Sequence, residues 1–349
     1  MRPTMKMIAQ KMGVSTMTVS LALKDHPRIS TETREEVKRV AEEMGYRTNP
    51  MVSSLMAHIR SSRPVPYQAN LAFLSDFERK DSWKELPFIR AAYEGMCSRA
   101  DEQGFLIDNF WINEKGMQGG RLEKILKSRN IQGVILSPLA ESGGLEYLDW
   151  SQWSSAALGD SLLSPRLHRV THHQTHGMEL LIEHLSQKGY RRIGLAIDHL
   201  SDTKVGHAWS SYMAGYLLRI PAKERVPIFT TSESSREETL QKFTRWFERH
   251  QPDVLVGHDH QLDILKGLGI SIPGDVSFAH LSLPSKLFPH SEISFSGLDQ
   301  NWTQIGAAAV DLVVAQIYRN ERGIPDISKT ILLEGSWVEG ESTPDRQNL

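Results

Sequence analysis

The sequence predicts two unlike parts: an all-α head of three short helices and, after a short linking helix, an α/β body of two doubly wound subdomains. Three observations support this fold class. Apolar residues repeat at helical spacing three times before residue 45, short apolar runs alternate with amphipathic segments from residue 69 onward, and the charge is divided unevenly. A chain of 349 residues also has enough material for two or three domains.

Charge separates the head from the body. Residues 1–63 contain eleven Lys and Arg residues against six Asp and Glu, a balance of +5, so the remainder carries −7 in a chain of net charge −2. A small basic head on a larger acidic body indicates that only the head binds a polyanion.

Composition narrows the class of protein. A hydrophobic fraction of 40% and a charged fraction of 23% are typical of soluble globular proteins. The sequence has no run of eighteen apolar residues that would form a transmembrane helix, and its first residues lack the apolar core of a signal peptide. The single cysteine, Cys97, excludes an internal disulfide framework and agrees with a reducing compartment. We therefore expect a soluble cytoplasmic protein with no membrane partner.

The head has the spacing of a helix-turn-helix. Helical periodicity predicts a first helix with Thr4 as its N-cap, a second after Ser15 and a third after Ser30. Their inward residues are Met5, Ile8, Ala9 and Met12; then Val19, Ala22 and Leu23; then Val37, Val40, Ala41 and Met44. Gly13 stands where a left-handed residue would end the first helix, and Gly45 ends the third. Three short helices with a tight turn between the first two form a helix-turn-helix.

The outward face of the second predicted helix suits DNA. It carries Thr16, Met17 and Ser20, with Leu21 and Lys24 at its edge. Small hydroxyls and an apolar tip match base edges and thymine methyl groups in a major groove. A three-helix cap with a solvated polar face is the alternative.

The body alternates strand-like and helix-like segments. Strand-like runs include “NLAFLSDF”, “FLIDNFWI”, “GVILSPL”, “RIGLAID”, “DVLVGH” and “VSFAHLSL”, and helices are expected around residues 88–103, 121–128 and 302–318. This alternation predicts parallel sheets with right-handed crossovers, and the strands are too many for one small sheet. Ligands of such folds bind at the carboxyl ends of the strands, here in the cleft between the two subdomains.

Three motifs in the head occur in order and without gaps: the “AxxxGVSxxTVS” core, “RISTETREEV” and “GYRTN”. In these motifs the head resembles the headpiece of LacI/GalR-type transcription regulators. The resemblance implies base-edge contacts from Thr16, Met17 and Ser20, an approach of Arg28 to the duplex, and phosphate contacts from Thr4, Thr18, Ser30, Tyr46 and Asn49. Leu21 stands where the family often has Arg, which favours an apolar base contact over a guanine contact.

The segment “PMVSSLMAHIRSSRP” after Asn49 predicts a short helix. Pro50 fits its first position, and Val52, Leu55 and Met56 give it an apolar side. One interpretation is a linker helix lying on the body. By the resemblance it is instead a hinge helix that pairs with its twin, contacts DNA through Val52 and Leu55, and inserts Leu55 into the minor groove. So short a helix is marginal alone, and we expect it to order only in the dimer on DNA.

Six motifs in the body also occur in order: “PFIRAAYEGM”, “RNIQGVILSP”, “GYRRIGLAI”, “QPDVLVGHD”, “GLGISIPGDVSF” and “LDQNWTQIGAAAVDLV”. In these motifs the body resembles the type I periplasmic-binding-protein-like effector domain of the same family. The chain is then expected to divide into a head at 1–48, a hinge helix and linker at 49–66, an effector-binding and dimerisation domain at 67–343 and a tail at 344–349. Its N-subdomain is expected at about 67–165 plus 300–326, and its C-subdomain at about 166–299 plus 327–343.

The resemblance also implies a set of effector-binding residues in the cleft, namely Phe88, Asp160, His173, Trp209, Tyr212, Asp259 and Gln300. Asp160, Asp259 and Gln300 retain the family's residues. Tyr212 replaces an Arg of sugar-sensing members, and His173 replaces an Asp. Because aromatic faces stack on the apolar face of a sugar ring, a carbohydrate effector is expected. For each of these residues a packing or surface role is the alternative.

Catalytic and metal chemistry have weak support in the sequence. His172, His173 and His176 lie close together, and His258 and His260 flank Asp259, but no Cys pair or carboxylate with firm ligand spacing accompanies them. The sequence lacks a nucleophile elbow, a phosphate-binding loop and a dinucleotide fingerprint. Cys97 falls inside an amphipathic helix and is interpreted as a packed thiol. We therefore expect no enzyme activity, no metal and no cofactor.

These observations together predict a sequence-specific DNA-binding transcriptional regulator, a repressor whose operator affinity depends on a small-molecule effector, a sugar. Its expected partners are pseudo-palindromic double-stranded operator DNA, the effector and a second copy of the chain. A dimer is favoured over a tetramer because the tail “STPDRQNL” has no heptad pattern. The alternatives are a solute-binding protein for a transporter and a sugar-modifying enzyme with a regulatory head.

Overall fold

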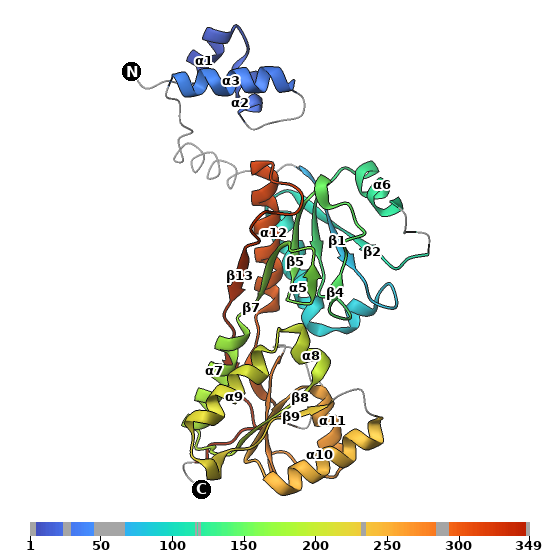
Figure 1. The fold of residues 1–349 in the computed structure, drawn as a ribbon, viewed down its shortest axis with the longest axis vertical. Helices are drawn as coiled ribbons and strands as arrows, with labels where there is room; N and C mark the ends of the chain where they lie inside the picture. The colour runs from blue at the N-terminus through green and yellow to red at the C-terminus, as the bar shows by residue number, and fades with distance from the viewer. Residues whose placement is uncertain are drawn as a thin grey trace.

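The computed structural model describes residues 5–23, 29–44, 67–115, 117, 120–231, 235–283 and 293–346. They form a three-helix unit and two α/β lobes that lie one beyond the other along the long axis (Figure 1). Among these residues, no helix is both long enough and apolar enough to cross a membrane.

The head consists of α1 (Met5–Met12), α2 (Thr16–Ala22) and α3 (Thr31–Glu43), as the periodicity predicts. Ser15 and Ser30 are the N-caps of α2 and α3, since their hydroxyls accept hydrogen bonds from the backbone N–H groups three residues on, at 3.0 and 3.2 Å. Gly13 has a φ of +67° and turns the chain from α1 into α2. The predicted Thr4 cap and Gly45 stop lie outside the described residues.

The first lobe is built on a six-stranded parallel sheet with the order β13-β7-β5-β3-β1-β2. Its strands are β1 (Ala69–Ser75), β2 (Phe105–Trp111), β3 (Ile131–Leu136), β5 (Ser154–Leu158), β7 (His168–His172) and β13 (Thr330–Leu333). Its helices are α5 (Pro87–Glu102), α6 (Arg121–Ser128) and α12 (Trp302–Arg319), with the short turns η1 (Ser82–Glu85) and η2 (Trp150–Gln152). The fragments β4 (Gly143–Gly144) and β6 (Leu162–Ser164) pair beside it. Three of the helices correspond to those predicted around residues 88–103, 121–128 and 302–318.

Helices cover both faces of this sheet. Alternate residues of each strand point to opposite sides, so each strand contributes to two cores. In β1, Leu71 and Phe73 pack in one core with α5 and α12. Ala72 and Leu74 pack in a second core with α6 on the other face. The near-continuous apolar run of β1 is therefore that of a strand buried on both sides.

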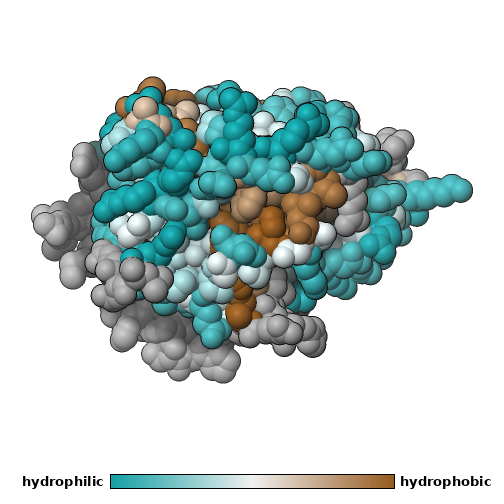
Figure 2. Space-filling view, turned by 90° about the horizontal axis from the view of Figure 1, so that it is seen from below, coloured by the Kyte–Doolittle hydropathy of each residue, from teal (hydrophilic) through white to brown (hydrophobic). Residues whose placement is uncertain are grey.

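The second lobe repeats this plan with the strand order β14-β12-β11-β10-β8-β9, in which only the β12–β14 pair is antiparallel. Its strands are β8 (Ile193–Asp198), β9 (Phe229–Thr231), β10 (Val254–Gly257), β11 (Ser277–His280), β12 (Ser296–Asp299) and β14 (Ser336–Val338). Its helices are α7 (Gln174–Gln187), α8 (His199–Lys204), α9 (Ala208–Arg219), α10 (Arg236–His250) and α11 (Asp259–Gly267), with the turn η3 (Ala222–Glu224). Seen end-on from below, the molecule presents a largely hydrophilic surface around a hydrophobic area (Figure 2).

Two glycines bring α5 and α12 into direct backbone contact. A Cβ atom at Gly306 would lie 1.9 Å from the carbonyl oxygen of Ala92, and one at Gly95 would lie 1.9 Å from that of Thr303. Only glycine fits at these two positions, because backbone atoms of the partner helix occupy the space. The N-terminal ends of both helices are thereby held side by side at the lower edge of the first lobe (Figure 1).

Within the described residues the chain passes between the lobes after β7, after β12 and after β13. The sequence-based boundaries at residues 166 and 327 are corrected by this topology. Residues 168–172 and 330–333 were expected in the C-subdomain, but β7 and β13 pair with each other in the sheet of the first lobe. The pairing joins segments about 160 residues apart, which local sequence patterns do not specify.

Candidate functional site

The outward surface of α2 is the first candidate site. Thr16 and Met17 are exposed, and 70% of the Met17 surface is accessible to solvent. Leu21 is half-buried at the edge of the same surface. A protruding methionine in the first turn of a helix is suited to apolar contact with a base edge. Because Met17 is exposed to water, it contributes little to the packing of the head itself.

The hydroxyls of Thr18 and Ser30 have structural roles within the head. Ser15 and Thr18 share a hydrogen bond of 2.8 Å between their hydroxyls, and Ser30 and Thr33 share another of 2.8 Å. Both pairs hold a helix N-terminus in place. The remaining expected DNA contacts lie outside the described residues: Thr4, Arg28, Tyr46, Asn49, Val52 and Leu55, together with the side chain of Ser20.

The second candidate site is a cavity of about 540 Å³ between the two lobes. Its lining comes from segments that follow strands of both sheets, as expected for ligand sites of doubly wound folds. Pro138 follows β3 and Asp160 follows β5 in the first lobe, while Asp259 follows β10 and Gln300 follows β12 in the second. The volume lies within the usual range for small-molecule sites.

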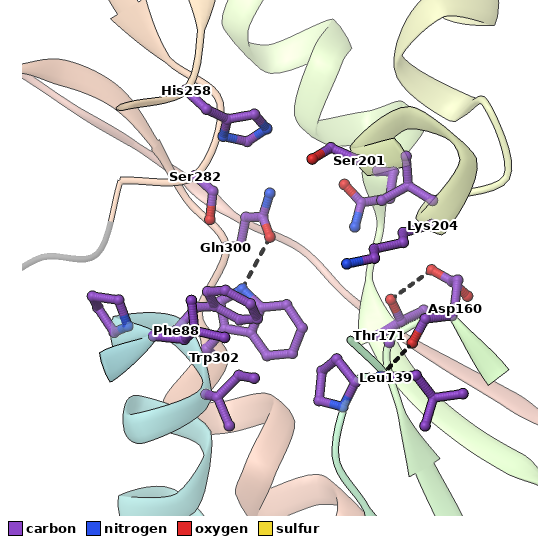
Figure 3. Close-up of a pocket in the computed structure, with 18 of the residues that line it drawn as sticks. Phe88, Leu139, Asp160, Thr171, Ser201, Lys204, His258, Ser282, Gln300 and Trp302 are labelled. Carbon is purple, nitrogen blue, oxygen red and sulfur yellow. Dashed lines mark hydrogen bonds between the residues drawn. The ribbon is translucent and has the colours of Figure 1, made fainter. Parts of the chain in front are cut away.

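An aromatic wall closes one side of this pocket. Phe88 lies in the first turn of α5 and Trp302 is the first residue of α12, and their ring centroids are 5.0 Å apart (Figure 3). The Trp302 indole N–H donates to Gln300 Oε1 at 3.0 Å, and the Gln300 amide donates to the carbonyl oxygen of Leu281 at 3.0 Å. Gln300 is buried, so these bonds fix the Trp302 ring in one orientation.

Asp160 provides a carboxylate on the first-lobe side. Its Oδ2 accepts a hydrogen bond from the Thr171 hydroxyl at 2.8 Å, and its Oδ1 lies 3.4 Å from the Arg169 guanidinium (Figure 3). Gly159, with a φ of +71°, makes the turn that brings Asp160 to the pocket at the end of β5. The carboxylate is therefore oriented and has accepting capacity left for a ligand hydroxyl.

Asp259 and His280 form a pair on the second-lobe side. The Ser282 N–H donates to His280 Nδ1 at 3.0 Å, so Nε2 carries the proton and donates to Asp259 Oδ1 at 3.0 Å. This hydrogen bond lowers the pKa of Asp259, which keeps the carboxylate charged.

His258 and Trp209 line the wall beside that pair. Their ring centroids are 5.1 Å apart, and the Trp209 indole N–H donates to Gln174 Oε1 at 2.9 Å. Burial lowers the pKa of His258 to about 4, so its imidazole is neutral at physiological pH. Within the described residues, His258 Nε2 is buried without a hydrogen-bond partner.

Five of the seven expected effector residues come together in this pocket: Phe88, Asp160, Trp209, Asp259 and Gln300. His173 and Tyr212 do not line it, which corrects their expected placement. His173 is the N-cap of α7, and its Nδ1 accepts the backbone N–H of His176 at 3.2 Å. Tyr212 lies one turn beyond Trp209 on α9, where it packs against the core of the second lobe.

The sequence analysis missed several residues of the pocket. Trp302 has the clearest signal, because it begins a long helix two residues after Gln300. His258 directly follows the strand “VLVG”; the sequence left it open as a metal ligand, a cleft-lining residue or a surface residue, and it was not among the expected effector residues. Lys204 lies on α8, a helix that the sequence patterns did not predict, and nothing in the sequence alone indicates it. Among the described residues, no three His, Cys, Asp or Glu side chains are grouped so as to hold a metal ion.

A helix-turn-helix head and a two-lobed α/β body with an interlobe pocket define the class of ligand-responsive DNA-binding regulators. Residues 4–49 match the family of bacterial regulatory proteins, lacI family, and residues 182–343 match the periplasmic binding protein-like domain. The chain therefore joins a LacI-type helix-turn-helix domain to a periplasmic-binding-protein-like domain, and its relatives are transcriptional regulators.

Relatives of similar sequence are named as transcriptional regulators. The HTH-type transcriptional regulator GalR of Salmonella typhimurium is 24% identical over 282 residues, which cover 78% of each protein. The HTH-type transcriptional regulator GntR of Pseudomonas aeruginosa is 35% identical over 160 residues, covering 43% of this chain and 47% of the relative.

Solved structures share the fold. A complex of the transcriptional regulator CelR with cellobiose matches 98% of this chain and all of its own, with a TM-score of 0.56 and 18% identity. The lac repressor dimer bound to operator and an anti-inducer matches 99% of this chain and all of its own, with a TM-score of 0.56 and 17% identity. At these identities the likeness concerns the fold alone.

Proposed function

We propose that the chain is a homodimeric repressor that binds a pseudo-palindromic operator and responds to a carbohydrate effector in the interlobe pocket. The observation that carries this proposal is the presence, in one chain, of an exposed recognition surface on α2 and a pocket lined by both lobes. The proposed DNA contacts are Thr4, Thr16, Met17, Thr18, Ser20, Leu21, Arg28, Ser30, Tyr46, Asn49, Val52 and Leu55. Operator binding requires location in the cytoplasm.

The chemistry of the pocket supports a carbohydrate. The rings of Phe88 and Trp302 offer an apolar surface for the face of a sugar ring. The carboxylates of Asp160 and Asp259 accept hydrogen bonds from hydroxyl groups. Structures of similar fold contain cellobiose, glucose and sucrose, which supports the same class of ligand here.

The pocket also offers a route from effector to operator. Its lining belongs to both lobes, so a ligand that contacts both favours one relative arrangement of the lobes over another. In the sequence, the linker at residues 49–66 joins the head to β1, which belongs to the first lobe. A change in lobe arrangement therefore couples the two sites, and the coupling free energy is the same in both directions.

We propose binding rather than catalysis in this pocket. In the His–Asp pair that lines it, the imidazole nitrogens of His280 are occupied by Asp259 and by the Ser282 amide. Neither nitrogen is left to activate a hydroxyl nucleophile, as a catalytic triad requires.

Selection of bound sequences from random double-stranded DNA tests the proposal. The full-length chain is expected to enrich a pseudo-palindromic site, whose affinity then changes on addition of a sugar. A variant lacking residues 1–60 is expected to lose this binding while it still dimerises and still binds the sugar. Sequence-specific binding that survives the truncation contradicts the proposed role of the head.

A further inference from the structure

The charged side chains that line the interlobe pocket differ in their partners. Glu85 pairs with Arg79 at 2.9 Å and Asp160 with Arg169 at 3.4 Å, while Asp259 accepts a hydrogen bond from His280 Nε2 at 3.0 Å. The lining cation Lys204 differs from them. In the part of the chain that the structure describes, no carboxylate lies within ion-pair distance of its ammonium.

Lys204 extends from α8 into the pocket, toward the aromatic wall of Phe88 and Trp302 (Figure 3). Its side chain is half-buried, and burial lowers its pKa. Three carboxylates act on it only from longer range, and two of them have other partners. Asp198 accepts the Ser201 N–H at 2.7 Å, and Asp76 accepts the Ala140 N–H at 3.1 Å.

A second observation on the same side of the pocket is independent of Lys204. His258 Nε2 is buried and has no hydrogen-bond partner among the described residues. His258, Ser201 and Lys204 all point into the cavity from the second lobe (Figure 3). Buried polar atoms are nearly always satisfied, so a missing partner at a cavity indicates a ligand or an ordered water. This side therefore offers up to three donors and one positive charge.

We propose that the effector is an anionic carbohydrate whose carboxylate or phosphate binds Lys204 Nζ, with His258 Nε2 and the Ser201 hydroxyl as further donors. This inference rests on the proposed function of the same pocket. The sugar ring lies on the wall of Phe88 and Trp302, and its hydroxyls reach Asp160. A neutral sugar leaves the half-buried ammonium without an anion at ion-pair distance, so the pocket favours an acid over its neutral counterpart.

Calorimetry of the full-length chain with charge-matched pairs tests the inference. The pairs are D-glucuronate and D-glucose, D-galacturonate and D-galactose, D-gluconate and D-sorbitol, and D-glucose 6-phosphate and D-glucose. The first three acids test a carboxylate and the last a phosphate, while acetate and inorganic phosphate control for the anion alone. At least one acid is expected to bind ten or more times more tightly than its neutral counterpart.

Substitutions then locate the charge. Lys204→Met is expected to raise the Kd of the acid at least tenfold, and Lys204→Arg is expected to restore part of the affinity. Lys266→Met removes an exposed lysine from α11 of the same lobe and is the matched control, with no expected change. Thermal unfolding checks that each variant is folded, and Lys204→Gln replaces the Met variant if that one is not.

The outcomes separate this inference from the proposed function. If neutral sugars bind as tightly as their acids and alter operator affinity, the inference is overturned and the repressor function stands. An acid that binds equally well to Lys204→Met also overturns the inference. If no member of the panel binds, charged or neutral, the carbohydrate effector and the inference both fail.

Discussion

Substituting Gly306 by Ala tests how the aromatic wall of the pocket, formed by Phe88 and Trp302, is held in place. The new Cβ would lie 1.9 Å from the Ala92 carbonyl oxygen, and ordinary contact begins near 3.4 Å, so α5 and α12 must separate by about 1.5 Å. Overpacking of this kind costs about 1–3 kcal/mol, and the better helix propensity of Ala offsets about 1 kcal/mol. Because the obstructing atom is backbone and cannot rotate away, we expect the upper end of the overpacking cost, about 3 kcal/mol, and therefore a net loss of roughly 2 kcal/mol.

The assay is thermal or denaturant unfolding followed by circular dichroism, with Gly215→Ala as the control. Gly215 lies in the exposed face of α9, where a Cβ meets nothing within 4 Å. That variant is expected to be stabilised, by up to about 1 kcal/mol, through helix propensity alone. Gly306→Ala should also weaken effector binding, because Phe88 and Trp302 lie in the first turns of the two displaced helices. A Gly306→Ala protein as stable as Gly215→Ala would refute the argument from backbone contact.

Three further predictions concern the head and the hinge between the lobes. Met17→Ala should weaken operator binding by about 1 kcal/mol per head without changing the unfolding midpoint, because Met17 is exposed. Unchanged operator affinity in a gel-shift titration would exclude Met17 from the DNA interface. Ser30→Ala removes the N-cap of α3 and should cost about 1 kcal/mol, measured as faster hydrogen exchange of the α3 amides, with exposed Glu42→Gln in that helix as the control. Burial lowers the pKa of His172 to about 4, so the folded state resists protonation while the unfolded state takes up a proton near pH 6.5. The contribution of His172 to the free energy of unfolding is complete above pH 6.5 and is lost as the pH falls toward 4, by about 2 kcal/mol at pH 5. His172→Gln should flatten the pH dependence of the free energy of unfolding, and an unchanged slope would rule out the assignment.

Much of the head could be predicted because its determinants are local. Helical spacing placed α1, α2 and α3, Ser15 and Ser30 cap the helices that follow them, and Gly13 adopts the left-handed turn. The same periodicity gave α5 and α12 in the body. Capping and amphipathic spacing act within one or two turns of chain, so the sequence carries them without reference to the rest of the fold.

The cleft could be predicted only in part. Phe88, Asp160 and Gln300 were expected from motif positions, and each lies within two residues of the end of an element that faces the pocket. Tyr212 was expected from its motif position as well, but on α9 it lies one turn beyond Trp209, where it is half-buried against the core of the second lobe. A motif position fixes the place along a helix, whereas the placing of the helix decides which turn reaches the cavity.

The sequence by itself determined the class of this protein: a basic helix-turn-helix head, an α/β body of two lobes, and motifs that resemble those of a regulator family. Only the tertiary structure decided that β7 pairs with β13 in the first lobe, that Phe88 meets Trp302, and that Lys204 faces the pocket without an ion pair. These features depend on contacts between segments far apart in the chain. Periodicity and capping describe neighbours along the sequence, and they carry no information about which distant surfaces meet.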